Sequence, residues 1–599
     1  MRKNIVLIWM VVSLFMILHS CNNTQSGKIH TYRIPRVAVI TTGVTQGNGI
    51  LPPGVIIAHQ YFNSQGVVTL PVDRTILLNP RELATYDILI ISTSAGYHDA
   101  DRMYSLTYMS DEELSNLEHF VNNGGYLIAG DNVGRNNDQG EDRISLYGKL
   151  TAENWPLSKC FGVTLEEKNM KGFCIVPAKR HEFYTDTFTN DLWILVPDSI
   201  LSDSISILAY WKTANSKIPA ILENNYGKGK AFLFASSYFL HPSNRGGFSD
   251  IANIEKFYKH IMDHFYQPIK HPVKINPWPA NHPYAFSLTL NADGNLEEFK
   301  RIINLASQNN MEVTAFVSGN SPSECVDYML ENKINLASSG YSQTNFKDKN
   351  YSGSLHDITH NEVFYNRCFK GFRFPFTITE PASLLVLSEK NYRYESSLGF
   401  GLEYFTGSVF PYKIPINHNG FFKISQIIEI SPVYHDDYFY FNELEKNKSV
   451  PSSRLYKSSM LYKDYLLNTL EHAVKNYNGQ FTWIGHPCYS GFSDTTILAL
   501  EGLVNKAVTD KAWLTTPYKM ATFRSKIEKL NVFVTESKDA VKIEIECEPG
   551  INISDFSIRL KQQPKKITLE TGKYKTYTSK GNYYVSFTAI NNQILKMKF

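Results

Sequence analysis

The residues in the middle of the chain that could do chemistry are a carboxylate, an amide, a guanidinium and an imidazole, each placed after an apolar stretch. They are Asp293, Asn291, Arg373 and His486. Hydrolytic sites use carboxylates and imidazoles to hold a metal ion or to move a proton. Residues this far apart in sequence meet only where a fold brings the ends of those stretches together.

Apolar strands alternate with helical segments throughout residues 284–530, the region that contains these side chains. The predicted strands are 285–290, 313–317, 334–337, 427–430, 481–484 and 513–516, and the predicted helices are 296–308, 325–332, 462–476 and 497–509. So many alternations predict an irregular β/α barrel, in which side chains that do chemistry stand at the carboxyl ends of the strands.

Several motifs in this region resemble, in the right order, those of the polysaccharide deacetylases, carbohydrate esterase family four. They are Thr289-Leu-Asn-Ala-Asp-Gly294, Gly371-Phe-Arg-Phe-Pro-Phe376, Tyr392-Arg-Tyr-Glu-Ser-Ser-Leu-Gly-Phe400 and Ile484-Gly-His-Pro487. The resemblance implies a metal ion held by one Asp and two His, an Asp base held by an Arg, and a late His that donates a proton. It assigns Arg373 to the base holder and His486 to the proton donor.

The positions that the resemblance assigns to the metal and the base are altered. Asp293 falls on the metal-binding Asp, while Asn291 or, in the other form of the motif, Ala292 falls on the base. An Asn side chain cannot take up a proton at neutral pH. Ser339 and Gln343 occupy the places of the two His, and neither residue type is a good zinc ligand. We therefore expect no bound cofactor, with zinc as the alternative.

Two functions follow from this pattern. The first, which we favour, is a protein that is not an enzyme and that binds or scaffolds a polysaccharide or peptidoglycan. The residues expected to contact the glycan are Asp293, Ser339, Gln343, Pro375 and Phe376. The second is an active deacetylase of an N-acetylated or O-acetylated polysaccharide with a non-standard metal site. Its ligands would come from His356, Asp357 and His360, or from His435, Asp436 and Asp437.

Residues 31–267 predict a separate α/β domain with a flavodoxin-like fold. The predicted elements are strands at 36–40, 87–92 and 126–129, a helix at 111–122 opened by the capping box of Ser110 and Glu113, and a hairpin around Gly227 and Gly229. The motifs Asp87-Ile-Leu-Ile-Ile91, Asn123-Gly-Gly-Tyr-Leu-Ile128 and Tyr226-Gly-Lys-Gly-Lys230 resemble those of the class I glutamine-amidotransferase-like fold. A final helix is expected at 250–265. The turn that would carry the catalytic cysteine, near Gly130-Asp-Asn132, holds none, so we expect a non-catalytic domain.

An alternative nucleophile set lies after the second of these strands, at Ser94, His98 and Asp99. Residues this close in sequence seldom form a triad, because their side chains point in different directions, and we expect them to be loop residues.

The rest of the chain predicts a linker and a small domain. Residues 268–283 include the Pro-rich stretch Pro277-Trp-Pro-Ala-Asn-His-Pro283 and predict a linker. Residues 531–599 alternate apolar and polar side chains in short runs separated by Gly and Asn, which predicts a small antiparallel β-sandwich.

The amino terminus predicts a bacterial lipoprotein. Arg2 and Lys3 precede an apolar run that is short for a membrane-spanning helix, and Leu18-His-Ser-Cys21 resembles the lipobox. We expect a signal peptide over residues 1–20, lipid on Cys21 and a tether over 21–30. The tether lacks an acidic cluster, which favours an outer-membrane lipoprotein that faces the periplasm.

Composition excludes other classes. The formal net charge of +3 is nearly balanced and no long basic block is present, so nucleic acid is not an expected partner. The cysteines that follow Cys21 show no Cys-x-x-Cys spacing, which argues against a zinc ribbon. Export permits disulfides, but the sequence leaves their pairing open.

Overall fold

The computed structural model describes residues 29–41, 50–91, 106–130, 132–170, 173–178, 186–188, 192–213, 216–234, 251–347, 349–402, 406–418 and 421–599. The predicted signal peptide, Cys21, most of the tether and the set Ser94, His98 and Asp99 lie outside these residues. Within the described ranges, no helix is both long enough and apolar enough to cross a membrane.

A curled sheet forms the centre of the region 284–530, and its strands follow the order β19-β20-β18-β17-β16-β15-β14-β21, with β22 also paired to β14. Their bounds are β14 (Ala285–Asn291), β15 (Val313–Val317), β16 (Asn335–Ser338), β17 (Gly371–Phe372), β18 (Tyr394–Glu395), β19 (Tyr412–His418), β20 (Phe421–Glu429), β21 (Gln480–Gly485) and β22 (Trp513–Leu514). All of these pairs are parallel except β19 with β20.

The sheet bends back on itself just beyond β20. Pro432 pairs with Thr482 of β21, and the Val433 amide donates to the Thr482 carbonyl at 2.9 Å. This contact joins the two ends of the parallel strand series. The expectation of an α/β protein with a curled, barrel-type central sheet is confirmed at this level.

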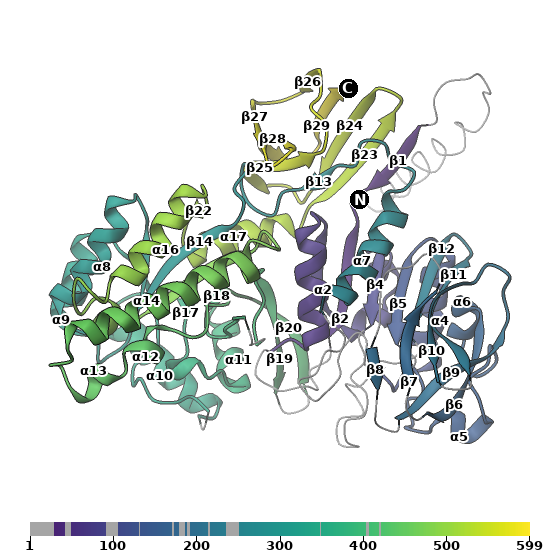
Figure 1. Cartoon of the computed structure of the whole chain (residues 1–599), viewed down its shortest axis with the longest axis horizontal. Helices are drawn as coiled ribbons and strands as arrows, with labels where there is room; N and C mark the ends of the chain where they lie inside the picture. The colour runs from purple at the N-terminus through teal and green to yellow at the C-terminus, as the bar shows by residue number, and fades with distance from the viewer. Residues whose placement is uncertain are drawn as a thin grey trace, which may run out of the picture.

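Helices surround this sheet, as Figure 1 shows in teal and green. They are α8 (Leu296–Gln308), α9 (Ser323–Glu331), α10 (Tyr351–Phe364), α11 (Pro381–Glu389), α12 (Asp437–Phe441), α13 (Glu443–Lys446), α14 (Ser452–Thr469), α15 (Pro487–Ser490), α16 (Leu498–Thr509) and α17 (Pro517–Ile527). The helix expected over 462–476 begins earlier than predicted, directly after Pro451. It continues through a π-helical turn, Leu470–Val474.

A second sheet lies to the right in Figure 1, with strand order β3-β2-β4-β5-β12-β11-β10-β7-β8. Its strands are β2 (Arg36–Thr41), β3 (Val68–Asp73), β4 (Ile88–Ile91), β5 (Tyr126–Gly130), β7 (Phe173–Pro177), β8 (Asp186–Phe188), β10 (Ser206–Lys212), β11 (Lys217–Tyr226) and β12 (Gly229–Phe234). The first five in spatial order are parallel and the remainder are antiparallel. β6 (Val163–Met170) and β9 (Leu192–Ile200) pair separately.

The helices of this region are α2 (Pro53–Ser64), α3 (Pro80–Leu83), α4 (Asp111–Asn122), α5 (Arg143–Tyr147), α6 (Leu157–Phe161) and α7 (Ile251–Tyr266). The capping box expected at Ser110 and Glu113 opens α4, with both reciprocal hydrogen bonds formed. β4 is buried along its whole length, which is typical of a parallel strand with cover on both faces. The flavodoxin-like, amidotransferase-like assignment stays a prediction.

The carboxyl-terminal strands form two further sheets, at the top of Figure 1. One has the order β1-β23-β24-β29-β26, and the other has the order β13-β25-β28-β27. Their bounds are β1 (His30–Arg33), β13 (Lys274–Ile275), β23 (Asn531–Ser537), β24 (Ala540–Glu546), β25 (Asn552–Leu560), β26 (Lys566–Leu569), β27 (Tyr574–Ser579), β28 (Asn582–Ile590) and β29 (Gln593–Lys598). The assignment as a β-sandwich stays a prediction.

Two segments from earlier in the chain belong to these carboxyl-terminal sheets. β1, which spans the expected end of the tether, pairs with β23, and β13, inside the expected linker, pairs with β25. The cysteines that follow Cys21 are all free: Cys160, Cys174, Cys325, Cys368, Cys488 and Cys547.

Candidate functional site

A cavity of about 590 Å³ opens at the carboxyl ends of the barrel strands. Every residue that the sequence analysis assigned to the site lines it: Asn291, Asp293, Ser339, Gln343, Arg373, Pro375, Phe376 and His486. Asn291 ends β14 and His486 directly follows β21, its parallel neighbour, so the register of the sheet brings the two together. The roles expected for these residues are considered below from their contacts.

Arg373 is buried beneath the cavity, with 1% of its surface exposed. Its Nη2 donates to Thr289 Oγ1 at 2.7 Å, its Nε donates to the Ser396 carbonyl at 2.9 Å, and its Nη1 donates to Asn291 Oδ1 at 3.4 Å. Its guanidinium also lies 4.0 Å from the centre of the Phe316 ring. Burial lowers the pKa of Arg373 to about 10, against the opposing effect of Glu395. The side chain therefore stays charged at neutral pH and fixes Asn291.

Asn291 is held between Arg373 and His486. A guanidinium only donates, so it takes the amide oxygen and leaves the amide nitrogen facing His486 Nε2 at 2.9 Å. An amide NH₂ group also only donates, so this contact opposes protonation of Nε2, whereas the carboxylates around His486 favour it. A carboxylate at this position would instead accept a hydrogen bond from a protonated Nε2.

His486 is fixed from its other side by Asp437, which is fully buried at the start of α12. Asp437 Oδ1 lies 2.8 Å from His486 Nδ1, and its Oδ2 accepts the His486 backbone N–H at 2.9 Å. Burial by itself lowers the pKa of His486, but the carboxylates of Asp437, Asp293 and Asp436 outweigh it and raise the pKa to about 9. The carboxylates thus orient the imidazole and favour its charged form.

Asp293 lines the cavity next to His486. Its Oδ2 lies 4.0 Å from His486 Nε2, and its Oδ1 accepts from the Cys488 thiol at 3.5 Å. Burial raises the pKa of Asp293 to about 6, although His486 works in the opposite direction. Asp293 is therefore ionised at neutral pH and protonated in mild acid.

The two positions expected for metal-binding His residues are used differently. The Ser339 hydroxyl donates to the Arg373 carbonyl at 3.0 Å, which is a contact that holds the chain together. Gln343 lines the cavity with a neutral amide and has a left-handed backbone conformation, with φ of 51°. Neither side chain brings charge to the cavity.

The first alternative ligand set lies outside the residues that line the cavity. Asp357 accepts from the Tyr341 amide and from Lys349 Nζ, both at 2.7 Å, and so it fixes the loop after β16. The His360 ring stacks on Tyr341, with 3.8 Å between ring centres. His356, in the same helix, also lies outside the cavity lining.

The second alternative set does approach His486. Asp436, Asp437 and His486 each place a ligand atom within 4.8 Å of the others, while His435 lines the cavity outside this group. Among the described residues, one other group of three possible ligands has this spacing, Glu223 with His260 and His264, in the other half of the molecule.

Aromatic side chains surround the cavity mouth, and the sequence analysis did not single most of them out. Their exposed fractions are 71% for Phe376, 57% for Phe439, 45% for Tyr438 and 39% for Tyr434. The signal that could have identified most of them is the aromatic run Tyr434-His-Asp-Asp-Tyr-Phe-Tyr440. The sequence analysis also missed Cys488. Burial and the nearby Asp293 raise the pKa of its thiol.

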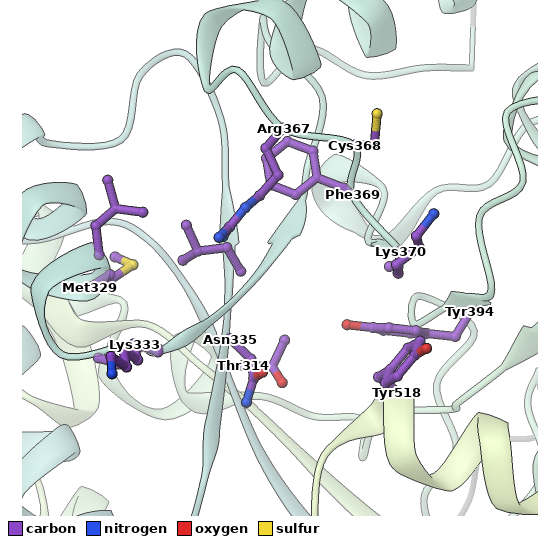
Figure 2. Close-up of a pocket in the computed structure, with 14 residues that line it drawn as sticks. Thr314, Met329, Lys333, Asn335, Arg367, Cys368, Phe369, Lys370, Tyr394 and Tyr518 are labelled. Atoms are coloured by element: carbon purple, nitrogen blue, oxygen red, sulfur yellow. The ribbon is translucent and has the colours of Figure 1, made fainter.

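A second cavity, of about 390 Å³, lies at the opposite ends of the same strands (Figure 2). It is lined by residues at or near the starts of β15, β16, β17 and β18, among them Thr314, Asn335, Lys370 and Tyr394. Lys333 and Arg367 add positive charge, and none of Asn291, Asp293, Arg373 and His486 lies there. Since barrel chemistry stands at the carboxyl ends of strands, the first cavity is the candidate site.

Comparisons with known proteins give partial likenesses. A family model of the β-galactosidase trimerisation domain matches residues 104–265. No curated protein matches the chain.

Among solved structures, one described as a polysaccharide deacetylase from Mycobacterium smegmatis is similar at 16% identity and a TM-score of 0.35, over 42% of this chain and 93% of that one. A mutant of a CE4 family pseudoenzyme with restored enzymatic activity is similar at 14% identity and a TM-score of 0.25, over 40% and 69%. A β-galactosidase from Bacillus circulans sp. alkalophilus is similar at 16% identity and a TM-score of 0.27, over 41% and 34%. No residue role follows from similarities this low.

Proposed function

We propose that this chain is a lipoprotein of the bacterial cell envelope whose barrel cavity binds or scaffolds a glycan without hydrolysing it. The observation that carries the proposal is the Asn291 amide at the place where a deacetylase keeps its base. Arg373 donates to it as it would to a carboxylate, yet an amide takes up no proton from water. The cavity therefore has a positioned proton donor without a matching base.

The residues present do not fit the zinc ion that the deacetylase resemblance implies. Such a site needs imidazole, thiolate or carboxylate ligands. Of the three expected positions, only Asp293 offers one of these, since Ser339 is engaged with a backbone carbonyl and Gln343 carries a neutral amide. We assign no step of a reaction to a metal ion in this cavity.

The shape and lining of the cavity favour a sugar as the ligand. Exposed aromatic rings at its mouth suit the apolar face of a pyranose ring, and exposed apolar groups that gather at one place mark a binding surface. The cavity is also lined by the carboxylates of Asp293, Asp436 and Glu445 and by the amide of Gln343, which can bind hydroxyl groups. A volume of about 590 Å³ is within the range of ligand pockets. A polysaccharide or peptidoglycan fits this chemistry.

The membrane association is a proposal from the amino-terminal sequence. The lipobox-like Leu18-His-Ser-Cys21 supports lipid on Cys21, and the tether composition supports an outer-membrane location facing the periplasm. Globomycin sensitivity of processing, together with the loss of membrane association in Cys21→Ser, tests it. Unchanged membrane association in Cys21→Ser would contradict it.

The glycan proposal is tested by binding and by acetate release on the same purified chain. We expect binding of an N-acetylated polysaccharide or peptidoglycan by calorimetry, and no acetate release with or without added zinc. Phe439→Ala is expected to weaken binding about tenfold, because it removes a ring from the cavity mouth. Tyr456→Ala is the matched control, because Tyr456 is equally exposed, at 53%, but lies on α14 away from the cavity.

A restored variant makes the same point by gain of function. Asn291→Asp combined with Ser339→His and Gln343→His supplies a base and two imidazoles at the altered positions. We expect this variant to bind one more equivalent of zinc than the wild-type chain and to release acetate. A folded, zinc-loaded variant with no turnover on any acetylated glycan would mean that these positions do not form a deacetylase site.

The second candidate function is an active deacetylase with a non-standard metal site. The close spacing of Asp436, Asp437 and His486 favours it. Stoichiometric metal in the purified chain, lost in Asp436→Asn together with acetate release, would establish this candidate and remove the binding-only proposal.

A further inference from the structure

A group of polar side chains away from the barrel links the last helix of the amino-terminal region to its sheet. Glu223 belongs to β11, and His260 and His264 belong to α7. Residues four apart on a helix share a face, so both imidazoles turn toward the same point on the sheet. α7 and β11 are labelled in Figure 1.

The distances between the ligand atoms in this group are compatible with a shared metal ion. Glu223 Oε2 lies 3.1 Å from His260 Nε2 and 3.3 Å from His264 Nε2, and the three ligand atoms all lie within 4.8 Å of one another. Around a tetrahedral zinc ion, with ligand bonds of about 2.0–2.1 Å, neighbouring ligand atoms are about 3.3–3.4 Å apart. The two carboxylate–imidazole distances already match this spacing, and the two imidazole nitrogens lie within 4.8 Å of each other.

The carboxylate is already held so that one oxygen faces the imidazoles. Lys230 Nζ donates to the other oxygen, Glu223 Oε1, at 2.5 Å and to Asn225 Oδ1 at 2.7 Å. Partners of this kind orient a ligand without occupying its binding atom. Glu223 itself is 7% exposed at its side chain, so it is pre-positioned from the sheet side.

The imidazoles leave the outer side of the group open. The side chains of His260 and His264 are 18% and 29% exposed, and their rings are nearly perpendicular, at 88°, with centres 4.5 Å apart. A water molecule can complete a tetrahedral set from the solvent side, as in zinc sites with three protein ligands. Imidazole together with carboxylate favours zinc or a similar transition metal over magnesium or calcium.

We propose that Glu223, His260 and His264 form a site for a divalent transition metal of the zinc class. The metal joins α7 to β11 and so stabilises the amino-terminal α/β region, since a site assembled only in the folded chain couples binding to folding. The site is independent of the barrel cavity and of its proposed glycan binding.

The test is a titration of the purified full chain with Zn²⁺, followed by Co²⁺, whose visible absorption reports nitrogen and oxygen ligands in tetrahedral geometry. We expect binding of one equivalent at this site and a higher Tm with zinc. His260→Gln and His264→Gln, made separately, are each expected to weaken binding by about 100-fold or more, because each removes a direct ligand. Far-UV circular dichroism establishes that each variant is folded.

Two controls locate the metal. His119→Gln alters an exposed His on α4 in the same region and should leave the affinity unchanged. His486→Gln alters the other group of possible ligands and should also leave this equivalent in place. Loss of the bound metal in His486→Gln but not in His264→Gln would overturn the proposal, as would a wild-type chain that binds no zinc. In that case the group is only a hydrogen-bonded ion network around Glu223.

Discussion

The two sides of the barrel cavity differ in what their side chains do. On one side, Arg373, Asp437 and His486 form a connected set of hydrogen bonds that fixes a charged imidazole. On the other, Ser339 and Gln343 stand where a metal site would need imidazoles, and Ser339 bonds only to the backbone. The side with Arg373, Asp437 and His486 also connects the ends of the barrel strands. Its residues therefore stabilise the fold even if no reaction takes place.

The largest effect is expected on the connected side. Arg373→Ala removes a buried cation and leaves Thr289, Asn291 and the Ser396 carbonyl without their donor. We expect the free energy of unfolding to fall by about 3–4 kcal/mol, measured by urea denaturation. Arg454→Ala is the control, because the Arg454 side chain is 64% exposed, and it should change stability by less than about 0.5 kcal/mol. Equal losses of stability in Arg373→Ala and Arg454→Ala would contradict a structural role for the connected side.

The pH dependence of stability is the next largest effect. The folded pKa of His486 is raised from 6.5 to about 9, so its contribution is fully present below pH 6.5 and is lost as the pH rises through 9. We expect the stability advantage of wild type over His486→Gln to fall by about 3 kcal/mol between pH 6 and pH 10. A difference that grows as the pH rises would have the wrong sign.

Glycan affinity should depend on pH through Asp293, whose pKa is raised to about 6. The ionised carboxylate accepts hydrogen bonds from sugar hydroxyls and the protonated form accepts fewer, so affinity should rise about tenfold between pH 5 and pH 7. Calorimetry at each pH measures it. Asp293→Asn should remove the pH dependence, and a variant that keeps it would show that another group is responsible.

The smallest effect belongs to the altered side. Ser339→Ala removes one hydrogen bond to the Arg373 carbonyl and should lower the free energy of unfolding by about 1 kcal/mol. Added zinc should change the Tm of wild type and of Ser339→Ala by the same amount, since Ser339 is no metal ligand in this account. A zinc-induced shift that depends on Ser339 would place a metal on this side after all.

Much of the site could be predicted from sequence because its residues follow strands that pair in parallel. Asn291, Arg373 and His486 stand at or just after the ends of β14, β17 and β21, and a parallel sheet gathers such ends at one edge. Local sequence patterns also predicted the start of a helix correctly. The capping box of Asn295 and Glu298 opens α8 at Leu296, the residue at which the sequence pattern placed its start.

Contacts between residues far apart in the chain could not be predicted from the sequence. Asp437 fixes His486 from 49 positions away, and no local pattern distinguishes it from its neighbour Asp436. β1 is too short to signal a partner, yet His30 pairs with Glu536 at the other end of the chain. Both contacts depend on how separate elements pack, which periodicity and spacing do not encode.

The central claim is that the cavity holds a proton donor without a base or a metal, and acetate release tests it most directly. Purified chain, supplied with zinc and with N-acetylated and O-acetylated glycans, is predicted to bind glycan and to release no acetate above the buffer rate. Catalytic release that is lost in His486→Gln, or that depends on a stoichiometric metal ion, would contradict the account.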